Sequence, residues 1–279
     1  MEKLQAALAR AREKRETDGG TPRGPAHQGR TTRDQARKKV ADEGIAAAWA
    51  SLANADPDSR RLNQSRIFAG TAVSEAQAFD ILRAKLLLEM RQQGWTRIAI
   101  TSATPGCGKT TVACNLIAGM SRQPDVRGIL FDFDLRRPSV GRFFGVTPPE
   151  SIASVLDGSV DFARQAMQIA DNAALSVATG PVSDPARLMT RNSVTETLDE
   201  IQSRFRPDIM IFDTPPVLVS DEARALLKLV DATLIIAQAE QSTVAQIDEA
   251  EREVAQYSSV AGVVLNKLVH TSGDSGYDY

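Results

Sequence analysis

The chain has 279 residues and a formal net charge of -2, with 42% hydrophobic and 24% charged residues. This length suits one sizeable domain with extensions or two small domains, and a charge so close to zero gives no reason to expect a nucleic-acid partner. No run of 18 apolar residues is present, so no membrane-spanning helix is expected. The charged start lacks the apolar core of a signal peptide, and the two cysteines form no spaced disulfide framework. We therefore expect a cytoplasmic protein.

Residues 1–64 are predicted to form a basic, largely disordered arm. A short amphipathic helix is expected over residues 1–16, where two leucines lie one turn apart among charged residues. Residues 17–34 contain almost no large apolar side chain and cannot bury enough surface to offset the entropy of ordering. An Ala-rich stretch at 45–52 is expected to be helical only transiently. Residues 10–39 contain ten Lys or Arg and four Asp or Glu, which favours a solvated segment over one that binds an anionic membrane or an acidic partner.

Residues 65–270 are predicted to form the folded domain. Its first helix is indicated by Phe79, Leu82, Leu86 and Met90, which recur at spacings of three and four and define one buried face. Strands are then predicted at residues 97–101, 128–133, 175–178, 209–212, 232–237 and 260–265, and helices at 110–122, 184–205, 221–229 and 243–257. Continuous apolar strands between helices indicate an α/β fold with a mostly parallel sheet and helices on both faces.

A phosphate-binding loop is predicted at residues 103–110, between a strand and a helix. The segment fits the pattern G-x-x-x-x-G-K-[ST], except that Ala103 replaces the first glycine. Glycines let backbone amides close on phosphate oxygens, the lysine places a charge on the β- and γ-phosphates, and the threonine hydroxyl is a magnesium ligand. The predicted nucleotide-binding residues here are Thr104, Pro105, Gly106, Cys107, Gly108, Lys109, Thr110 and Thr111. The flanking strand and helix favour this reading over an unliganded turn and predict a P-loop NTPase of the partition-ATPase-like architecture.

Two further acidic sites lie at the ends of predicted strands. Asp132 and Asp134 follow an apolar run, and strand alternation predicts that they point the same way. Asp213 follows a second apolar run, as a Walker B carboxylate does for magnesium. Ligands of open α/β sheets bind at the carboxyl ends of the strands, so we expect these carboxylates near the phosphate loop. Solvated acids that end a strand are the plainer alternative.

Together these motifs resemble those of the bacterial protein-tyrosine kinases of capsule and exopolysaccharide synthesis. The family has a Walker A loop, a D-x-D-x-R motif, a Walker B strand ending in D-x-x-P, and a tyrosine-bearing tail. The matching positions are 103–110 for the loop, Asp132, Asp134 and Arg136, then Asp213 with Pro216, and Tyr277 with Tyr279. The likeness spans about residues 75–279.

The resemblance implies an ATP-dependent enzyme that uses Mg²⁺. Asp132 and Asp134 would share the positioning of magnesium and the activation of a tyrosine hydroxyl, and the sequence leaves open which of them takes the proton. Asp213 would act on magnesium through water, and Arg136 would stabilise phosphate charge. Asn266 resembles the residue that reads adenine in the family, although a polar strand end is an alternative role. Lys109 would be part of the catalytic set.

The resemblance also implies an autokinase whose acceptors are Tyr277 and Tyr279, in a flexible tail over residues 271–279. The expected partners are a separate membrane-spanning polysaccharide co-polymerase or activator, a cognate tyrosine phosphatase and further copies of the chain. We thus expect a cytoplasmic protein held at the inner face of the membrane through its partner. The chain departs from the family's assembly motif E-x-x-R-x-x-R, because the matching positions are Gln77, Asp80 and Arg83.

Two other functions remain open from the sequence. Partition and division-site ATPases hydrolyse ATP to switch dimerisation and carry an additional lysine early in the loop. Thr104, followed by Pro105, occupies that position here, which argues against this class. A regulator that binds ATP without transferring phosphate is the other alternative.

Overall fold

The structure is a computed structural model that describes residues 42–57, 59–68 and 74–268. The helix expected at 1–16, the disordered segment at 17–34 and the tyrosine-bearing tail lie outside these residues. Among the described residues, no helix is long and apolar enough to cross a membrane.

The chain divides into two compact units, Met1–Gly44 and Ile45–Tyr279. Of the first unit only residues 42–44 are described, and they are helical. The second unit contains the sheet, its covering helices and all the predicted site residues that the structure describes.

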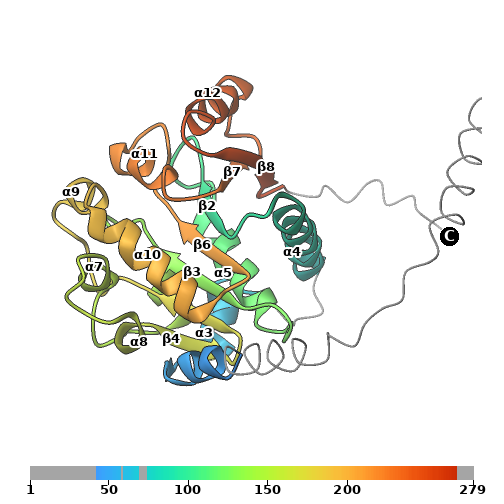
Figure 1. The fold of residues 1–279 in the computed structure, drawn as a ribbon. Coiled ribbons are helices and arrows are strands. Elements are labelled where there is room, and N and C mark those ends of the chain that lie inside the picture. Colours follow the sequence, from blue (N-terminus) through green and yellow to red (C-terminus); the bar gives the residue numbers. More distant parts are fainter. Residues whose placement is uncertain (1–41, 58, 69–73, 269–279) are drawn as a thin grey trace, which may run out of the picture. The chain divides into compact units, whose positions relative to one another are not determined.

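The described residues of the second unit form an eight-stranded sheet in the order β1-β4-β5-β3-β6-β2-β7-β8 (Figure 1). Neighbouring strands run parallel, except for the antiparallel pair β4 and β5. The strands are β1 (Ala53–Asn54), β2 (Arg97–Thr101), β3 (Gly128–Asp132), β4 (Met167–Ala170), β5 (Ala173–Ser176), β6 (Ile209–Asp213), β7 (Ala232–Gln238) and β8 (Ser259–Asn266). All five residues of both β3 and β6 are buried, which is typical of parallel strands covered on two faces. The predicted fold class is therefore confirmed.

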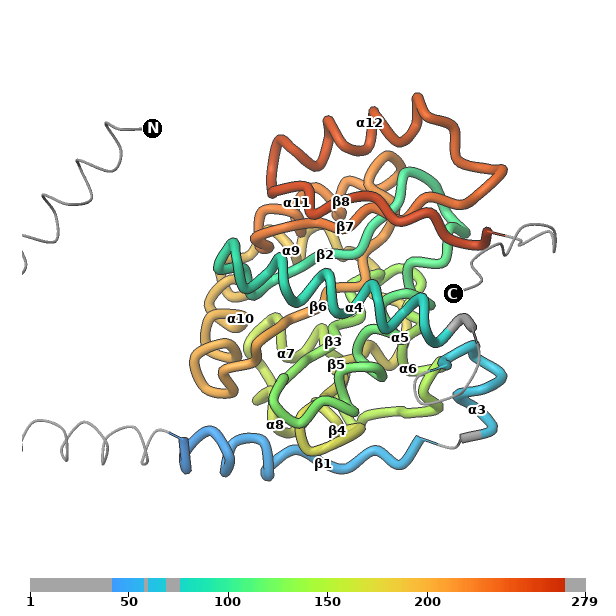
Figure 2. The backbone as a smooth tube through the Cα atoms, turned by 90° about the vertical axis from the view of Figure 1, so that its right-hand side faces the viewer, coloured from blue at the N-terminus to red at the C-terminus, as the bar shows by residue number. Residues whose placement is uncertain are grey.

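Helices cover both faces of this sheet. Their bounds are α3 (Ser59–Gln64), α4 (Ser74–Gln93), α5 (Lys109–Met120), α6 (Val140–Phe144), α7 (Ile152–Leu156), α8 (Phe162–Gln165), α9 (Pro185–Met189), α10 (Asn192–Phe205), α11 (Asp221–Leu227) and α12 (Val244–Val254). Buried side chains of α4, α5 and α6 form one core, and those of α7 to α12 form the other. Figures 1 and 2 show α4 and α10 on opposite sides of the sheet. Strand alternation divides the side chains, because Ile98 and Ile100 join the first core while Ala99 joins the second.

The folded unit begins earlier than the sequence predicted. Residues 45–50 are helical, and Ile45, Trp49 and Leu52 are buried in the core. The Trp49 indole donates a hydrogen bond of 2.7 Å to the carbonyl of Phe205, and their rings meet edge to face. β1 then pairs with β4. The arm predicted over residues 1–64 is therefore wrong for residues 45–54 and 59–64, which form a helix, a strand and α3. Its core side chains are held by contacts distant in sequence, such as that of Trp49 with Phe205.

The segment that follows α3 is fastened to α5 by one buried side chain. The Asn115 Oδ1 accepts a hydrogen bond of 2.8 Å from the amide of Phe68, and its Nδ2 donates to the carbonyls of Arg66 and Thr111 at 2.8 and 2.9 Å. Ile67, between the two held residues, is buried beside α5. This part of the chain is thus tied to the helix that begins at the phosphate loop.

The observed secondary structure differs from the predicted one at two places in the middle of the domain. The helix predicted over 184–205 is two helices, α9 and α10, because Arg191 adopts an extended conformation between them. Asp184 caps α9, and Pro185 takes its first turn as expected. The short elements α6, α7, α8 and β4 were not predicted, since each spans at most five residues and shows no periodicity.

Candidate functional site

The predicted phosphate loop connects β2 to α5, whose first residue is Lys109. Gly106 and Gly108 have φ angles of 86° and 92°, in the left-handed region that favours glycine. A Cβ on Gly108 would also collide with Nδ2 of Asn266, so that the Asn266 side chain would have to move. The loop thus has the glycine-dependent backbone that lets amides approach an anion at the start of a helix.

The remaining predicted loop residues contribute mainly backbone groups. The Thr104 carbonyl accepts hydrogen bonds from the hydroxyl of Ser102 and the thiol of Cys107. Pro105 is exposed, Cys107 is buried, and the Thr111 carbonyl lies in the first turn of α5, where it accepts from Asn115. Nothing in these contacts requires the side chain of Pro105 or Cys107 to touch a nucleotide.

The end of β8 supports the loop from the side. The Asn266 Nδ2 donates to the Cys107 carbonyl at 2.8 Å, and the Lys267 ammonium donates to the Gly106 carbonyl at 2.7 Å. Sequence reasoning missed Lys267, although its position directly after Asn266 could have signalled it. The structure brings Asn266 beside the phosphate loop, and its role in reading adenine stays a prediction.

Three polar side chains from β3, β6 and α5 meet under the loop. The Thr110 hydroxyl donates a hydrogen bond of 2.6 Å to Oδ2 of Asp213. Asp132 and Asp213 are register partners on the adjacent strands β3 and β6, and both are fully buried. The Asp132 Oδ2 accepts from the backbone amides of Ser139 and Val140 at 2.8 and 2.9 Å. The Ser139 hydroxyl, missed by sequence reasoning, donates to the Thr110 hydroxyl oxygen at 3.3 Å.

This arrangement fits a magnesium ion. The Oδ1 atoms of Asp132 and Asp213 are both buried and have no hydrogen-bond partner among the described residues. Burial raises the pKa of Asp213 to about 7, although the Thr110 hydrogen bond and the Lys109 charge oppose the shift. Burial and the Asp213 charge raise the pKa of Asp132 well above its usual value. A divalent cation would relieve this repulsion, and magnesium is usually held by one or two carboxylates together with phosphates and waters.

Asp134 lies in a different environment from Asp132. The chain leaves β3 after Asp132 and turns, with the Arg137 amide donating to both the carbonyl and Oδ1 of Asp134. The strand predicted to continue to residue 133 is therefore one residue shorter. Asp134 lines a cavity of about 520 Å³ together with Lys109, Gly106 and Arg136, whereas Asp132 does not. Burial raises the pKa of Asp134 above its usual value, against the influence of Lys109.

Arg136 is engaged by an acid that sequence reasoning missed. Its Nε forms an ion pair with Oε1 of Glu222, the second residue of α11. The Arg136 side chain is 61% exposed and that of Glu222 only 4%. Burial acts to raise the pKa of Glu222, but the Arg136 hydrogen bond and further polar contacts bring it below its usual value. Glu222 thus stays charged and holds Arg136 at the rim of the 520 Å³ cavity.

Comparison with protein families gives one match that covers more than half of the chain. A family model named ParA, described as NUBPL iron-transfer P-loop NTPase, matches residues 95–277. This range contains the phosphate loop, both acidic sites and Asn266.

Curated relatives are tyrosine-protein kinases. The chain is 31% identical over 184 residues to the tyrosine-protein kinase YwqD of Bacillus subtilis, covering 64% of this chain and 76% of that protein. It is 26% identical over 205 residues to the putative tyrosine-protein kinase AmsA of Erwinia amylovora. The match covers 73% of this chain and only 28% of AmsA, so the chain spans little more than a quarter of that relative.

A solved structure has the same fold. The kinase domain of the Escherichia coli tyrosine kinase ETK superposes with a TM-score of 0.65 and 25% sequence identity. The match covers 75% of this chain and 81% of that chain.

Proposed function

The chain belongs to the bacterial tyrosine-protein kinases among the P-loop NTPases, and from this premise we propose that it transfers the γ-phosphate of ATP to tyrosine side chains. One observation carries the proposal: Lys109 and Asp134 line one cavity, and Thr110 and Asp213 are hydrogen-bonded to each other close by. Phosphoryl transfer needs little covalent help from the protein and depends on positioning and charge stabilisation, which these residues can supply.

The phosphates belong on the loop. Its amides and the Lys109 ammonium hold them, and Arg136, fixed by Glu222, adds positive charge at the cavity rim. Thr110 and the unpartnered oxygens of Asp132 and Asp213 hold magnesium. The ion, when bound, neutralises part of the phosphate charge. Because the other Asp132 oxygen is committed to two backbone amides, this residue also fixes the loop before α6.

Asp134 is the general base in this proposal. A tyrosine hydroxyl has a pKa of about 10 and is protonated at neutral pH, so removal of its proton assists attack. Asp134 lines the cavity beside Lys109, while Asp132 is enclosed. As the tyrosine oxygen forms its bond to the γ-phosphorus, the bond to the β-phosphate oxygen breaks, ADP leaves, and the phenolic proton passes to the Asp134 carboxylate.

The proposed acceptors are Tyr277 and Tyr279, which lie outside the described residues. The chain has three tyrosines. The remaining one, Tyr257, packs against the hydrophobic core beneath the ammonium group of Lys228. A side chain engaged in this way is a poor acceptor, which favours the two tyrosines near the end of the sequence.

The wider assignment follows the resemblance. We propose a role in exopolysaccharide or capsule export, with a membrane-spanning co-polymerase as activator, a tyrosine phosphatase that reverses the reaction, and self-association at the inner face of the membrane. The positions that match the family's assembly motif lie on α4 and make contacts within the chain. Arg83 pairs with Asp80 and donates a hydrogen bond of 2.8 Å to the carbonyl of Gly119. Any oligomer must therefore use other groups, or break these contacts.

Iron transfer, named in the description of the family model, is disfavoured by the thiols. The chain has two cysteines, and both are buried. Burial raises the pKa of the Cys114 thiol well above its usual value, whereas at Cys107 the effect of burial is outweighed by hydrogen bonds to Thr104 and Ser242, which lower the pKa. The one thiol that favours ionisation cannot by itself supply the set of thiolates that holds iron. The partition-type switch is disfavoured because Thr104 offers a hydroxyl where that class needs a lysine.

The proposal is tested by incubation of the full chain with labelled ATP and magnesium, with and without its membrane partner, followed by intact mass and peptide mapping. Phosphate on Tyr277 or Tyr279 that Lys109→Met abolishes is the expected result. Phosphate release without protein labelling would identify a hydrolytic switch instead. Tight ATP binding with neither outcome would identify a regulator.

A further inference from the structure

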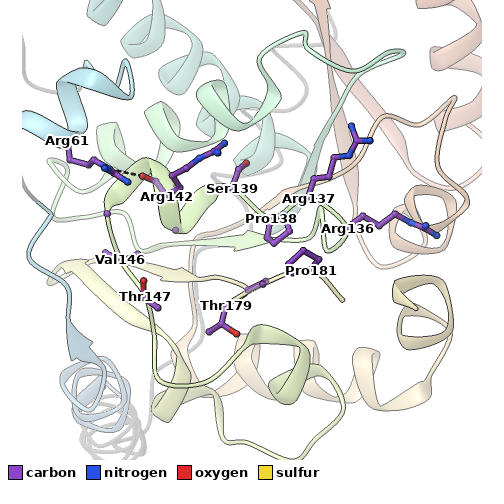
Figure 3. A pocket seen from close by; sticks show the side chains of 14 residues that line it. Arg61, Arg136, Arg137, Pro138, Ser139, Arg142, Val146, Thr147, Thr179 and Pro181 are labelled. Carbon is purple, nitrogen blue, oxygen red and sulfur yellow. Dashed lines mark hydrogen bonds between the residues drawn. The ribbon is translucent and has the colours of Figure 1, made fainter. Parts of the chain in front are cut away.

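A second cavity, of about 550 Å³, lies next to the proposed active site and is basic (Figure 3). Its lining includes the four arginines Arg61, Arg136, Arg137 and Arg142, with hydroxyl groups from Ser139, Thr147 and Thr179. No Asp or Glu is among the described residues that line it. We call this cavity the arginine pocket.

The arginines of the pocket differ in how they are engaged. Arg136 is paired with Glu222. The Arg61 Nε donates to the backbone carbonyl of Arg142 at 3.1 Å, a contact that leaves its positive charge unbalanced. The side chains of Arg137 and Arg142 form no hydrogen bond or ion pair with a described residue, although the positive charge of Arg137 acts on the Asp134 carboxylate of the neighbouring cavity. The pocket therefore has an excess of positive charge and guanidinium groups that can bind an anion.

The arginine pocket adjoins the 520 Å³ cavity that holds Lys109 and Asp134. Arg136 and Arg137 line both cavities. Figure 3 shows Arg61 at one end of the arginine pocket and Arg136 at the other, with Thr179 and Pro181 between them. A ligand that spans both cavities must be elongated, and an extended peptide covers about 3.3 Å per residue.

We propose that the arginine pocket binds acidic side chains next to the acceptor tyrosine of a peptide, and so selects acidic, tyrosine-bearing segments as substrates. This inference rests on the proposed kinase function and adds its peptide specificity. Carboxylates in the pocket would hold the peptide while the neighbouring tyrosine reaches Asp134. Arg–carboxylate pairs give both strength and geometric selection, because the guanidinium can bind two oxygens at once.

The chain itself contains a segment of this kind. Residues 273–279 read Gly-Asp-Ser-Gly-Tyr-Asp-Tyr, in which Asp274 and Asp278 flank Tyr277. The pocket thus matches in charge the segment that the proposed function already offers as an acceptor. Arg61 comes from α3, so the folded stretch before the phosphate loop completes the pocket.

The test uses the full chain with Tyr277 and Tyr279 replaced by Phe. The chain's own proposed acceptors then do not compete with the added peptides. The probes are the peptide Gly-Asp-Ser-Gly-Tyr-Asp-Tyr and its counterpart with both Asp replaced by Asn. We expect the Asn peptide to have a KM about tenfold higher at similar kcat. Arg142→Gln and Arg61→Gln should raise the KM of the acidic peptide by a similar factor, while leaving the KM of the Asn peptide and of ATP unchanged.

Arg252→Gln is the matched control, because Arg252 is exposed on α12 and lines neither cavity. It should leave all these constants unchanged. Arg142 is exposed, so its substitution should preserve the fold, which ATP binding verifies. Equal KM values for the two peptides, or KM values indifferent to both arginine substitutions, would overturn the inference while the kinase function stands.

A binding measurement separates this inference from the kinase function. Fluorescence anisotropy with the labelled peptide Gly-Asp-Ser-Gly-Phe-Asp-Phe requires no phosphoryl transfer. Binding that Arg142→Gln weakens about tenfold, in a protein that phosphorylates nothing, would support the pocket and overturn the kinase. Absence of both binding and phosphorylation would overturn both.

Discussion

The Thr110 hydroxyl donates to Oδ2 of Asp213 across 2.6 Å, which joins the first turn of α5 to the end of β6. The donated proton leaves lone pairs on the Thr110 oxygen, and one of them already accepts from Ser139. A cation that binds the Thr110 oxygen would therefore displace at most the hydrogen bond from Ser139. The hydrogen bond between Thr110 and Asp213 would remain. The fold thus already brings together two of the groups proposed to hold magnesium, the Thr110 hydroxyl and the Asp213 carboxylate.

The first prediction concerns Asp213→Asn in the nucleotide-free protein. The pKa of Asp213 is about 7 in the folded state and about 3.9 in an unfolded chain, so the folded state holds more protons between these pH values. Stability contributed by this group must then fall as pH rises from about 4 to 7. The amide cannot ionise, and at pH 8 the variant should be more stable by on the order of 2–4 kcal/mol, or about 4–12 °C in Tm.

Thermal melts of both proteins at pH 4, 6 and 8 test this prediction. The difference should nearly vanish at pH 4, and addition of magnesium with ATP should stabilise only the native protein. Asp248→Asn, at an exposed position on α12, controls for the loss of one negative charge. A variant less stable than the native protein at pH 8 would contradict the cost of burying the Asp213 charge.

A second prediction separates the two acids of the D-x-D-x-R motif. Asp134→Asn should lower kcat by roughly 10²-fold or more, because the cavity loses its base, and should leave nucleotide affinity nearly unchanged. Asp132→Asn should weaken magnesium-dependent nucleotide binding, since the unpartnered Oδ1 of Asp132 is one of the proposed magnesium ligands. Titration calorimetry and steady-state labelling distinguish these outcomes. The reverse pattern would assign the proton to Asp132.

The sequence could predict the parts of the site that are consecutive or that end long apolar strands. Each position of the phosphate loop has its own chemical requirement, so the motif alone identifies Lys109 and Thr110. Ser139 and Lys267 escaped because they reach the site only through the folded sheet. Ser139 follows the turn that returns to Asp132, and Lys267 ends the strand that lies beside the loop.

The fold was predictable for a similar reason. Buried strands such as β2 and β6 show as uninterrupted apolar runs, and β2 was predicted with its observed bounds. The helix at residues 45–50 was predicted to be only transient, because a segment of this length shows too few apolar repeats to indicate a buried face. Its order comes from contacts far along the chain, such as Trp49 with Phe205, 156 residues away.

The third prediction tests that contact. Trp49→Ala should lower the free energy of unfolding by about 3–5 kcal/mol, as expected for a large buried aromatic side chain. Trp49→Phe keeps most of the ring contact and loses the hydrogen bond to Phe205, so it should cost about 1–3 kcal/mol. Urea unfolding gives both values. A disordered arm at these residues would instead give no change in either variant.

A fourth prediction compares two glycines of the phosphate loop. Both have positive φ angles, but only Gly108 lies against another side chain, whereas a Cβ on Gly106 meets nothing within 4 Å. Gly106→Ala should cost about 1–2 kcal/mol of backbone strain. Gly108→Ala should cost more, because Asn266 must also move and release the Cys107 carbonyl.

ATP titrations and thermal melts of the two alanine variants provide the measurement. We expect Gly108→Ala to lose at least tenfold more affinity than Gly106→Ala. Adding Asn266→Ala to the Gly108 variant should recover part of its thermal stability, because the steric conflict is removed. Equal effects of the two glycine substitutions would show that Asn266 does not constrain the loop.

The fastening of residues 66–68 by Asn115 has a practical consequence for work with shorter versions of this protein. The recognisable motifs begin near residue 75, and trimming to that point would look harmless on an alignment. It would remove four buried core side chains and two of the three hydrogen bonds of the Asn115 carboxamide on α5. The core surface exposed by this deletion would be apolar, and we expect such a fragment to be poorly soluble. A fragment that begins before Ile45 should remain soluble and folded.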